Sequence, residues 1–168
     1  MAESNSNLHL SIVTVVGAKN SGKTTFLEFL LNRARNMNLS IGGFLSRGNI
    51  VNHQKREYFL EDLTSGERHL LASTTTHPSR KIRYGSYYFN PDVFKLGQRL
   101  LLRNMDSDLL VMDEFGPLEL RGEGFRESFN LVLKEYHGIF LVAVRPSLLS
   151  DIKSIFKSGK RISVLPKF

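Results

Sequence analysis

The residues best suited to chemistry lie at positions 17–25, where the sequence reads G-A-K-N-S-G-K-T-T. The first eight fit the spacing G-x-x-x-x-G-K-S/T, in which glycines let backbone N–H groups wrap around phosphate oxygens at a helix start. The spacing therefore predicts a phosphate-binding loop. We expect Lys23 to reach the β- and γ-phosphates, Thr24 to bind magnesium and Thr25 to lie near the α-phosphate. The expected phosphate-binding residues are Gly17, Ala18, Lys19, Asn20, Ser21, Gly22, Lys23, Thr24 and Thr25.

A pair of carboxylates, Asp113 and Glu114, follows directly after the apolar run L-L-V-M at residues 109–112. An apolar strand that ends in acidic residues has the form of a Walker B segment, the usual companion of a phosphate loop. We expect Asp113 to hold magnesium, generally through water, and Glu114 to orient or deprotonate the attacking water. Acidic pairs after apolar runs are common, so the Walker B interpretation is justified only together with the phosphate-binding loop at residues 17–24.

A positive side chain is also expected, because a phosphoryl group in transfer carries negative charge that an arginine commonly counters. Arg145 is a candidate, since it follows the apolar run at residues 139–144 and would emerge at the ligand edge of a parallel sheet. Arg47, Arg56 and Arg121 lie in glycine-rich segments that could fold over the site. The expected catalytic residues are Lys23, Glu114 and Arg145.

These residues need a scaffold, and the sequence predicts one in which strands and helices alternate. Residues 10–16 are apolar and β-branched and end at a glycine, whereas residues 25–37 repeat apolar side chains at helical spacing. Pro91 opens a second expected helix, which runs to Leu102. The other expected elements are strands at residues 109–112, 139–144 and 162–165 and helices at residues 125–136 and 147–156. This order predicts a three-layer α/β fold of the P-loop type with a mostly parallel sheet.

The segment from residue 39 to residue 90 has a different character. Short stretches such as I-G-G-F-L-S and R-E-Y-F-L-E-D-L are separated by glycines, Gly48 and Gly66 among them, as is typical of antiparallel strands joined by turns. Residues 80–89 are basic and aromatic and predict one further strand. We therefore expect a β-rich insertion, an antiparallel hairpin region, within a single domain spanning residues 1–168.

The composition narrows the class of protein. The chain is 41% hydrophobic and 23% charged, values typical of a folded globular protein. It contains no cysteine, which excludes disulfides, thiolate nucleophiles and Cys-ligated zinc, so we expect any metal to be magnesium that arrives with phosphate. Lys and Arg number 23 against 16 Asp and Glu, and the net charge of +7 suits an anionic ligand such as a nucleotide or RNA.

The sequence shows no membrane or export signal. No apolar run approaches the roughly 18 residues needed to span a bilayer. The N-terminal M-A-E-S-N-S-N has neither the basic start nor the apolar stretch of a signal peptide. We expect a cytoplasmic monomer without membrane contact.

Three stretches together resemble the THEP-type P-loop nucleoside triphosphatases, the cancer-related nucleoside-triphosphatase family. The first is the phosphate loop, and the second is D-E-F-G-P-L-E-L at residues 113–120, which is similar to the family signature D-E-I/F-G-x-M/L-E-L. The third is G-G-F-L-S at residues 42–46, followed by L-T-S-G-E at residues 63–67. The resemblance covers most of the chain in order, and the D-E-F-G-P-L-E-L stretch is its most specific part.

The resemblance implies magnesium-dependent hydrolysis of several nucleoside triphosphates, ATP and GTP among them, to diphosphate and phosphate. Under it, the lysine, the threonine and the two carboxylates keep the roles given above, and Glu119 becomes a carboxylate beside the site. The first hairpin departs from the family pattern, because S-R-G-N at residues 46–49 lacks the acidic residue usual there.

Two other functions are compatible with the sequence. The loop G-A-K-N-S-G-K-T-T is also similar to that of the molybdopterin-guanine dinucleotide accessory proteins, which bind GTP to assist a partner enzyme. Residues 113–120 are not expected in those proteins, and no guanine-reading N/T-K-x-D segment occurs. A nucleoside or polynucleotide kinase is the second alternative, because Tyr84, Tyr87 and Tyr88 stand among cations and could stack bases of RNA or DNA.

Overall fold

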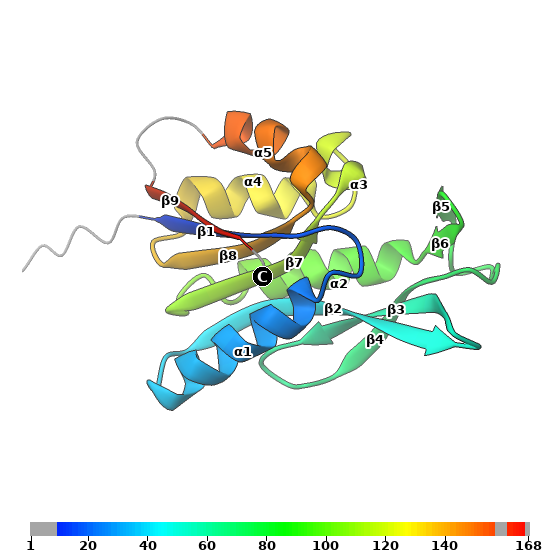
Figure 1. The fold of residues 1–168 in the computed structure, drawn as a ribbon, viewed down its shortest axis with the longest axis horizontal. Helices are drawn as coiled ribbons and strands as arrows, with labels where there is room; N and C mark the ends of the chain where they lie inside the picture. Colours follow the sequence, from blue (N-terminus) through cyan, green and yellow to red (C-terminus); the bar gives the residue numbers. More distant parts are fainter. Residues whose placement is uncertain (1–9, 157–160, 167–168) are drawn as a thin grey trace, which may run out of the picture.

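The structure, a computed structural model, describes residues 10–156 and 161–166. Within that part, nine strands form one sheet in the order β5-β6-β4-β3-β2-β7-β8-β1-β9 (Figure 1). The strands are β1 (Ser11–Val16), β2 (Ile41–Val51), β3 (Gln54–Asp62), β4 (Arg68–Ser73), β5 (Ile82–Tyr84), β6 (Tyr87–Phe89), β7 (Leu109–Phe115), β8 (Ile139–Val144) and β9 (Arg161–Pro166). The helices are α1 (Lys23–Asn36), α2 (Pro91–Leu102), α3 (Pro117–Leu120), α4 (Arg126–Glu135), the 3-10 helix η1 (Pro146–Leu148) and α5 (Leu149–Ile155).

The sheet is mixed, with a parallel half and an antiparallel half. The strands β2, β7, β8, β1 and β9 run parallel, which accounts for four of the eight neighbouring pairs. The strands β3, β4, β6 and β5 continue the sheet beyond β2 in antiparallel pairs. The α/β class is therefore confirmed, but the prediction of a mostly parallel sheet is wrong. The inserted antiparallel strands extend the main sheet.

The strand β2 joins the two halves. Its residues 41–44 pair in parallel with β7, and its residues 44–51 pair antiparallel with β3. Gly43 lies where β2 approaches β7 most closely, because a Cβ atom there would stand 2.0 Å from the carbonyl oxygen of Val111. Its φ of 92° also favours glycine. The G-G-F-L-S stretch therefore marks the point where the β-rich segment enters the sheet.

Residues 80–89 form a hairpin, and the prediction of a single strand there is wrong. β5 and β6 pair antiparallel with Tyr84 opposite Tyr87, so that Gly85 and Ser86 make the turn. Gly85 has a φ of 58°, which a two-residue hairpin turn favours. One glycine within a basic, aromatic segment was the only local signal for this turn.

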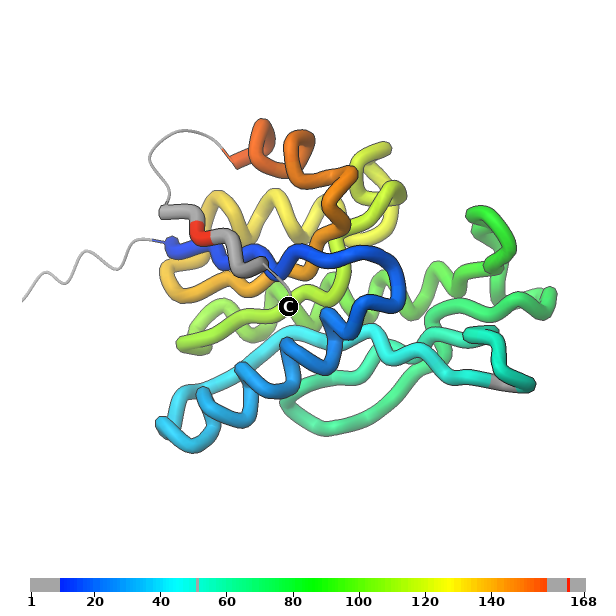
Figure 2. The backbone as a smooth tube through the Cα atoms, viewed as in Figure 1, coloured from blue at the N-terminus to red at the C-terminus, as the bar shows by residue number. Residues whose placement is uncertain are grey.

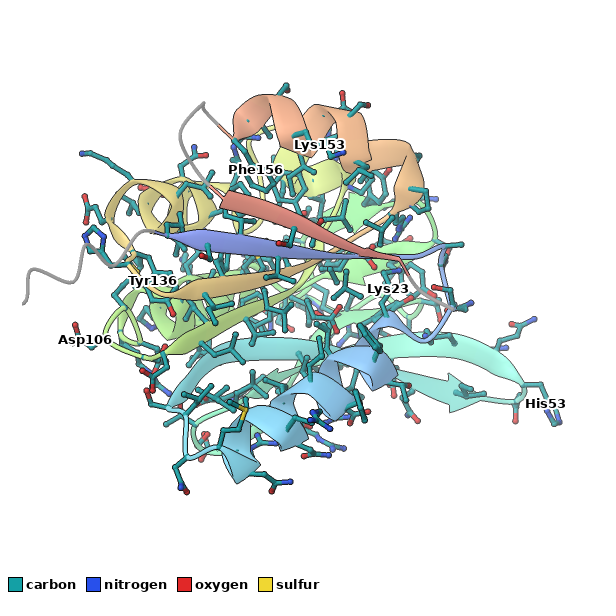
Figure 3. All side chains as sticks on the ribbon, turned by 60° about the vertical axis from the view of Figure 1, so that its left-hand side comes forward. Lys23, His53, Asp106, Tyr136, Lys153 and Phe156 are labelled. Carbon is teal, nitrogen blue, oxygen red and sulfur yellow. The ribbon has the colours of Figure 1, made fainter. Side chains whose placement is uncertain are left out.

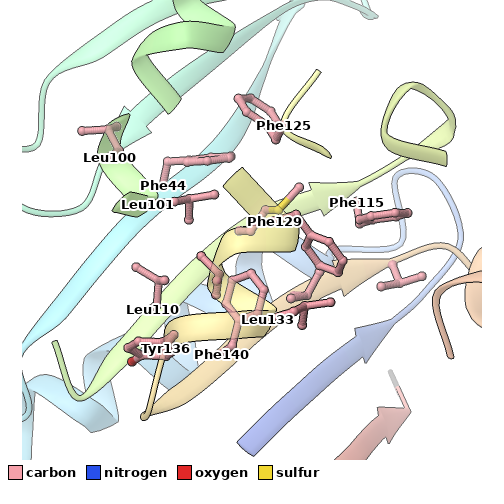
Figure 4. Packing of buried hydrophobic residues seen from close by; sticks show 14 of the residues in the cluster. Phe44, Leu100, Leu101, Leu110, Phe115, Phe125, Phe129, Leu133, Tyr136 and Phe140 are labelled. Atoms are coloured by element: carbon pink, nitrogen blue, oxygen red, sulfur yellow. The ribbon is translucent and has the colours of Figure 1, made fainter. Parts of the chain in front are cut away.

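Apolar side chains cover both faces of the parallel half. Along β7, Val111 belongs to the same core cluster as Leu27 of α1. Its neighbours Leu110 and Met112 point to the opposite face and belong to the cluster that α2 and α4 complete. Figure 4 shows this second cluster, in which rings from strands and helices interleave, for example Phe129 of α4. Two separate cores therefore hold the central strands in register.

The carboxyl ends of β1, β7 and β8 lie at one edge of the sheet, because these strands pair in parallel (Figure 2). The loop before α1, the acidic end of β7 and Arg145, which follows β8, consequently come together there. This is the edge at which open α/β sheets bind ligands.

The remaining elements agree closely with the sequence. α1 begins at Lys23 rather than Thr25, and β7 continues through the acidic pair to Phe115. The last helix is divided into η1 and α5, and the expected closing strand is β9. In the described ranges, 10–156 and 161–166, no helix combines the length and the apolar character needed to cross a membrane.

Candidate active site

The loop between β1 and α1 has the backbone of a phosphate-binding loop. The N–H of Gly17 donates to the carbonyl of Val144 at 3.2 Å, which ties the start of the loop to the end of β8. Asn20 and Gly22 have positive φ angles of 60° and 83°, and α1 begins directly after them. The loop therefore leads into a helix whose positive end faces the ligand edge of the sheet, an arrangement that binds anions.

Lys23 is a buried cation that joins the two predicted motifs. Its side chain is 5% exposed, and its Nζ lies 3.0 Å from the carbonyl oxygen of Ala18 and 3.1 Å from Oε2 of Glu114. A buried ammonium group is costly unless it is paired, so these two contacts account for its place in the loop. The phosphate loop and the acidic pair, whose residues Thr24 and Asp113 are 89 positions apart in sequence, therefore meet in space.

Asp113 is buried beside the loop, where Thr24 and Ser46 hold its carboxylate. The Thr24 hydroxyl donates to Oδ2 of Asp113 at 2.8 Å, and the Ser46 N–H donates to the same oxygen at 3.2 Å. The Ser46 hydroxyl also donates to the backbone carbonyl of Asp113. Burial raises the pKa of Asp113 to about 6, against the hydrogen bond from Thr24, which lowers it. Ser46 was not among the expected site residues.

Glu114 lies between two cations. Nε of Arg145 donates to Oε1 of Glu114 at 2.7 Å, while Nζ of Lys23 lies 3.1 Å from Oε2. Each carboxylate oxygen thus has its own cationic partner. The side chain of Glu114 remains 21% exposed, so a small molecule can reach it. The structure brings together all three expected catalytic residues.

The other candidate arginines are bound elsewhere. Arg47 lines the same cavity, but its guanidinium pairs with Glu28 and Glu61. Arg121 pairs with Glu123 at 3.5 Å, and Arg56 has Gln54 as its side-chain partner at 3.4 Å. Among the four candidates, Arg145 is therefore the arginine that contacts the acidic pair.

The remaining loop residues occupy two kinds of position. The hydroxyl of Ser21 is buried, and within the described part of the chain it is the buried side-chain oxygen without a hydrogen-bond partner. An unpaired hydroxyl in such a loop fits an anionic ligand. Lys19 and Asn20 are exposed and face the β-rich half, with Nζ of Lys19 5.4 Å from the ring centroid of Tyr87. Thr25 is exposed in the first turn of α1.

A cavity of about 1090 Å³ connects the phosphate loop with the β-rich half. Thr24, Asp113 and Glu114 line it, and so do Tyr58 and Tyr87 of the β-rich half. Among residues 10–156 and 161–166, no group of three or more His, Asp or Glu side chains is arranged to hold a metal by itself. The hydroxyl of Thr24 and the carboxylate of Asp113 are hard oxygen ligands that suit magnesium, which takes its other ligands from phosphate and water.

Glu119 is a second buried carboxylate close to the acidic pair. It is 4% exposed and accepts the N–H groups of Gly116 at 2.9 Å and Phe125 at 3.1 Å. Burial raises its pKa to about 7, although both hydrogen bonds act to lower it. Gly116 follows Glu114 by two residues, so Glu119 fixes the turn that carries the chain away from the acidic pair.

Comparison with known proteins gives one consistent group. A family model described as NTPase matches residues 12–166. The nucleoside-triphosphatase THEP1 of Methanothermobacter thermautotrophicus is 31% identical over 142 residues, which cover 84% of this chain and 80% of that protein. The matched region contains both the phosphate loop and the acidic pair.

Two solved structures share the fold. The crystal structure of THEP1 from the hyperthermophile Aquifex aeolicus has a TM-score of 0.68 at 19% identity and covers 94% of this chain and 90% of that one. The solution structure of a human cancer-related nucleoside triphosphatase has a TM-score of 0.71 at 20% identity. The match covers 93% of this chain and 88% of that one. At these identities the likeness concerns the fold alone.

Proposed function

This chain belongs to the NTPase family and is a nucleoside triphosphatase, and from that membership we propose that it hydrolyses several nucleoside triphosphates to diphosphate and phosphate with magnesium. One observation carries the proposal. Two motifs far apart in sequence meet at a single cavity, where Lys23 and Thr24 contact Glu114 and Asp113. The accessory-protein and kinase interpretations have no support from the comparisons.

The phosphates are held by the loop before α1. Backbone N–H groups at the start of the helix, together with the unpaired hydroxyl of Ser21, supply donors for phosphate oxygens. Lys23 adds a buried positive charge at the centre of the loop. These contacts address phosphate and not the base, which supports activity on ATP, GTP, CTP and UTP alike.

Thr24 and Asp113 are the residues that would hold magnesium. When bound, the ion supplies positive charge to phosphate oxygens. Ser46 keeps Asp113 in place by donating two hydrogen bonds, one to its carboxylate and one to its carbonyl. A neighbouring cation favours the ionised carboxylate and would oppose the effect of burial on the pKa of Asp113.

Glu114 takes a proton from the attacking water, but in the structure both of its carboxylate oxygens are already paired with cations, Lys23 and Arg145. While Lys23 and Arg145 pair with its oxygens, the carboxylate is turned toward these cations and not toward an attacking water. A γ-phosphate in the loop offers those cations a more highly charged partner. We infer that Lys23 and Arg145 then move their contacts to the phosphate, which frees Glu114 to act as the base and places positive charge where the transition state needs it.

The direct test is phosphate release from ATP, GTP, CTP and UTP by the wild type, Lys23→Ala and Glu114→Gln, with magnesium and with excess chelator. We expect release from all four by the wild type, and loss of release with the chelator. Glu114→Gln should lower kcat by about 10²- to 10⁴-fold, the usual contribution of a general base.

A matched control is Lys95→Ala, which removes an exposed lysine of α2 whose partner is Asp92. It should leave release within about twofold of the wild type, as for most surface substitutions. Unchanged turnover in Glu114→Gln would assign the water-activating role to another residue. Full activity in the chelator would remove magnesium from the proposal.

A further inference from the structure

Tyrosines and cations alternate across the β-rich half. Four of the five tyrosines in the chain lie on β3, β5 and β6, and each has a cation over its ring. The pairs, with distances from cation to ring centroid, are Lys19–Tyr87 at 5.4 Å, Lys55–Tyr58 at 5.5 Å, Arg83–Tyr88 at 5.7 Å and Arg121–Tyr84 at 5.0 Å. Such an arrangement combines flat stacking surfaces with positive charge.

Three of these tyrosines form one wall of the cavity that contains the acidic pair. Tyr58, Tyr84 and Tyr87, which we call the aromatic wall, line it, whereas Tyr88 does not. The rings of Tyr58 and Tyr87 meet edge to face with centroids 5.2 Å apart. The Tyr87 hydroxyl donates to the carbonyl of Lys55 at 2.7 Å, so the ring is fixed against β3.

Lys55, whose ammonium group lies over the Tyr58 ring of the aromatic wall, contacts the phosphate loop directly. Lys55, close to the turn between β2 and β3, donates to the side-chain oxygen of Asn20 in the loop at 2.9 Å. Figure 3 labels Lys23 at the start of α1 and His53 at the tip of this hairpin, which projects beyond the loop. A ligand on the aromatic wall would therefore lie beside a triphosphate bound in the loop.

Through Tyr58 the wall comes near the reacting end of the site. Burial is the main cause that raises the pKa of the Tyr58 hydroxyl, and the charges of Glu114 and Arg145 also act on it in opposite directions. Tyr58 is thus within electrostatic reach of the residues that would face the γ-phosphate. The base of the same triphosphate is separated from that point by two further phosphates and a ribose.

The cavity also has room for more than one ligand. Its volume of about 1090 Å³ is slightly above the range of roughly 300 to 1,000 Å³ usual for a single small ligand. The triphosphate occupies the end next to Lys23 and Asp113. The space between Glu114 and the aromatic wall is left for a second molecule.

From these observations we propose that the aromatic wall is a binding site for a second nucleotide, whose base stacks on Tyr84 and Tyr87 and whose phosphate meets Lys55, which lines the same cavity. A base with an attached phosphate is the ligand chemistry that aromatic rings beside cations recognise. It is supplied either by a free mononucleotide or by one residue of a single-stranded nucleic acid. The proposal assumes that the loop holds the triphosphate, as proposed above.

The test measures binding with the phosphate loop already filled by a non-hydrolysable ATP analogue and magnesium. One arm titrates a labelled single-stranded oligouridylate of about 12 residues, within the usual site sizes of such proteins. The other titrates labelled uridine monophosphate. The variants are Tyr87→Leu, Tyr87→Phe and Tyr88→Leu, the last being a matched control on the neighbouring, non-lining position of β6.

We expect Tyr87→Leu to weaken binding of whichever probe is recognised by roughly tenfold, the size of one base–aromatic stacking contact. Tyr87→Phe, which keeps the ring but loses the hydrogen bond to Lys55, should weaken binding much less than Tyr87→Leu does, and Tyr88→Leu should bind as the wild type does. Affinity for the oligonucleotide alone identifies a nucleic-acid strand as the ligand, and equal affinity per nucleotide identifies a mononucleotide. Either result supports the second site.

Absence of binding of both probes would overturn the proposal, and so would binding that Tyr87→Leu leaves unchanged. A third outcome is that the KM for ATP rises in Tyr87→Leu while neither probe binds. This result would place the base of the substrate itself on the aromatic wall and would also overturn the proposal. Phosphate release measured on the same samples separates this outcome from failure of the proposed hydrolysis, because the binding readout does not need turnover.

Discussion

The phosphate end of the cavity and its aromatic wall are built in opposite ways. At the phosphate end, Lys23 and Asp113 are 5% and 2% exposed and are held by short polar contacts. At the wall, Tyr84 and Tyr87 are partly exposed and stand beside the exposed cations Lys19 and Arg121. Buried charges must be paired, whereas partly exposed rings carry no charge that needs a partner.

The difference teaches where each function is encoded. The phosphate end depends on two short motifs that contact each other. Substitution of Lys23 or Thr24 in the loop therefore removes a partner of Glu114 or Asp113. The wall depends on topology, because β3, β5 and β6 reach it only through a sheet that continues past β2. Substitutions at the phosphate end should therefore change chemistry, and substitutions in the β-rich half should change binding or stability with chemistry intact.

The largest effect that separates the two regions is expected for Arg145→Ala. Arg145 pairs with Glu114 at 2.7 Å and is the arginine we assign to the γ-phosphate. Loss of one preorganised charge at a transition state typically costs about 10²- to 10³-fold in kcat. Single-turnover phosphate release at saturating nucleotide should show this loss. A kcat equal to that of the wild type would contradict the assignment of Arg145 to the γ-phosphate.

An intermediate effect is expected from Glu119, which supports the phosphate end from inside the core. Its pKa is raised from 4.5 to about 7 by burial, so the folded state binds the proton more tightly than the unfolded state does. The contribution of Glu119 to the free energy of unfolding is therefore fully favourable below pH 4.5, and it is lost as the pH rises through about 7. The loss is on the order of 3 kcal/mol.

Denaturant unfolding of the wild type and Glu119→Gln across this pH range checks the prediction. The variant should show a weaker fall in the free energy of unfolding, because residue 119 no longer titrates. The difference between the two curves isolates Glu119 from Asp113, whose pKa is also raised. Parallel curves would mean that the pKa of Glu119 is the same in the folded and the unfolded protein.

The smallest effect should come from Arg47→Ala in the β-rich half. Arg47 joins Glu28 of α1 to Glu61 of β3, and all three side chains are partly exposed. Solvent screening limits such networks, so the loss in the free energy of unfolding should be about 1 kcal/mol. Steady-state assays should find kcat within about twofold of the wild type. A fall as large as that of Arg145→Ala would abolish the contrast between the two regions.

The phosphate end was largely predictable from the sequence. Lys23 and Thr24 lie in a contiguous motif whose spacing fixes the backbone, and Asp113 and Glu114 end a strand that is apolar throughout. Arg145 followed from topology, because parallel strands bring their carboxyl ends to one edge. Local sequence patterns were enough to predict these residues, because each of them is positioned by one short segment.

The rest of the site required the structure. Ser46 reaches Asp113 only because β2 lies beside β7, a pairing that no local pattern specifies. Glu119 was recognised as close to the site, but its bonds to Gly116 and Phe125 depend on the α3 turn. The aromatic wall was hidden for the same reason, since its rings come from three strands whose order is set by long-range pairing.

The central claim is that Glu114 and the γ-phosphate compete for the same two cations, Lys23 and Arg145. The most direct measurement is calorimetric titration of Glu114→Gln and the wild type with a non-hydrolysable triphosphate in the presence of magnesium. Removing the carboxylate charge frees both cations, so the variant should bind the analogue about tenfold more tightly, a gain of about 1.4 kcal/mol. Affinity equal to or weaker than that of the wild type would contradict the claim.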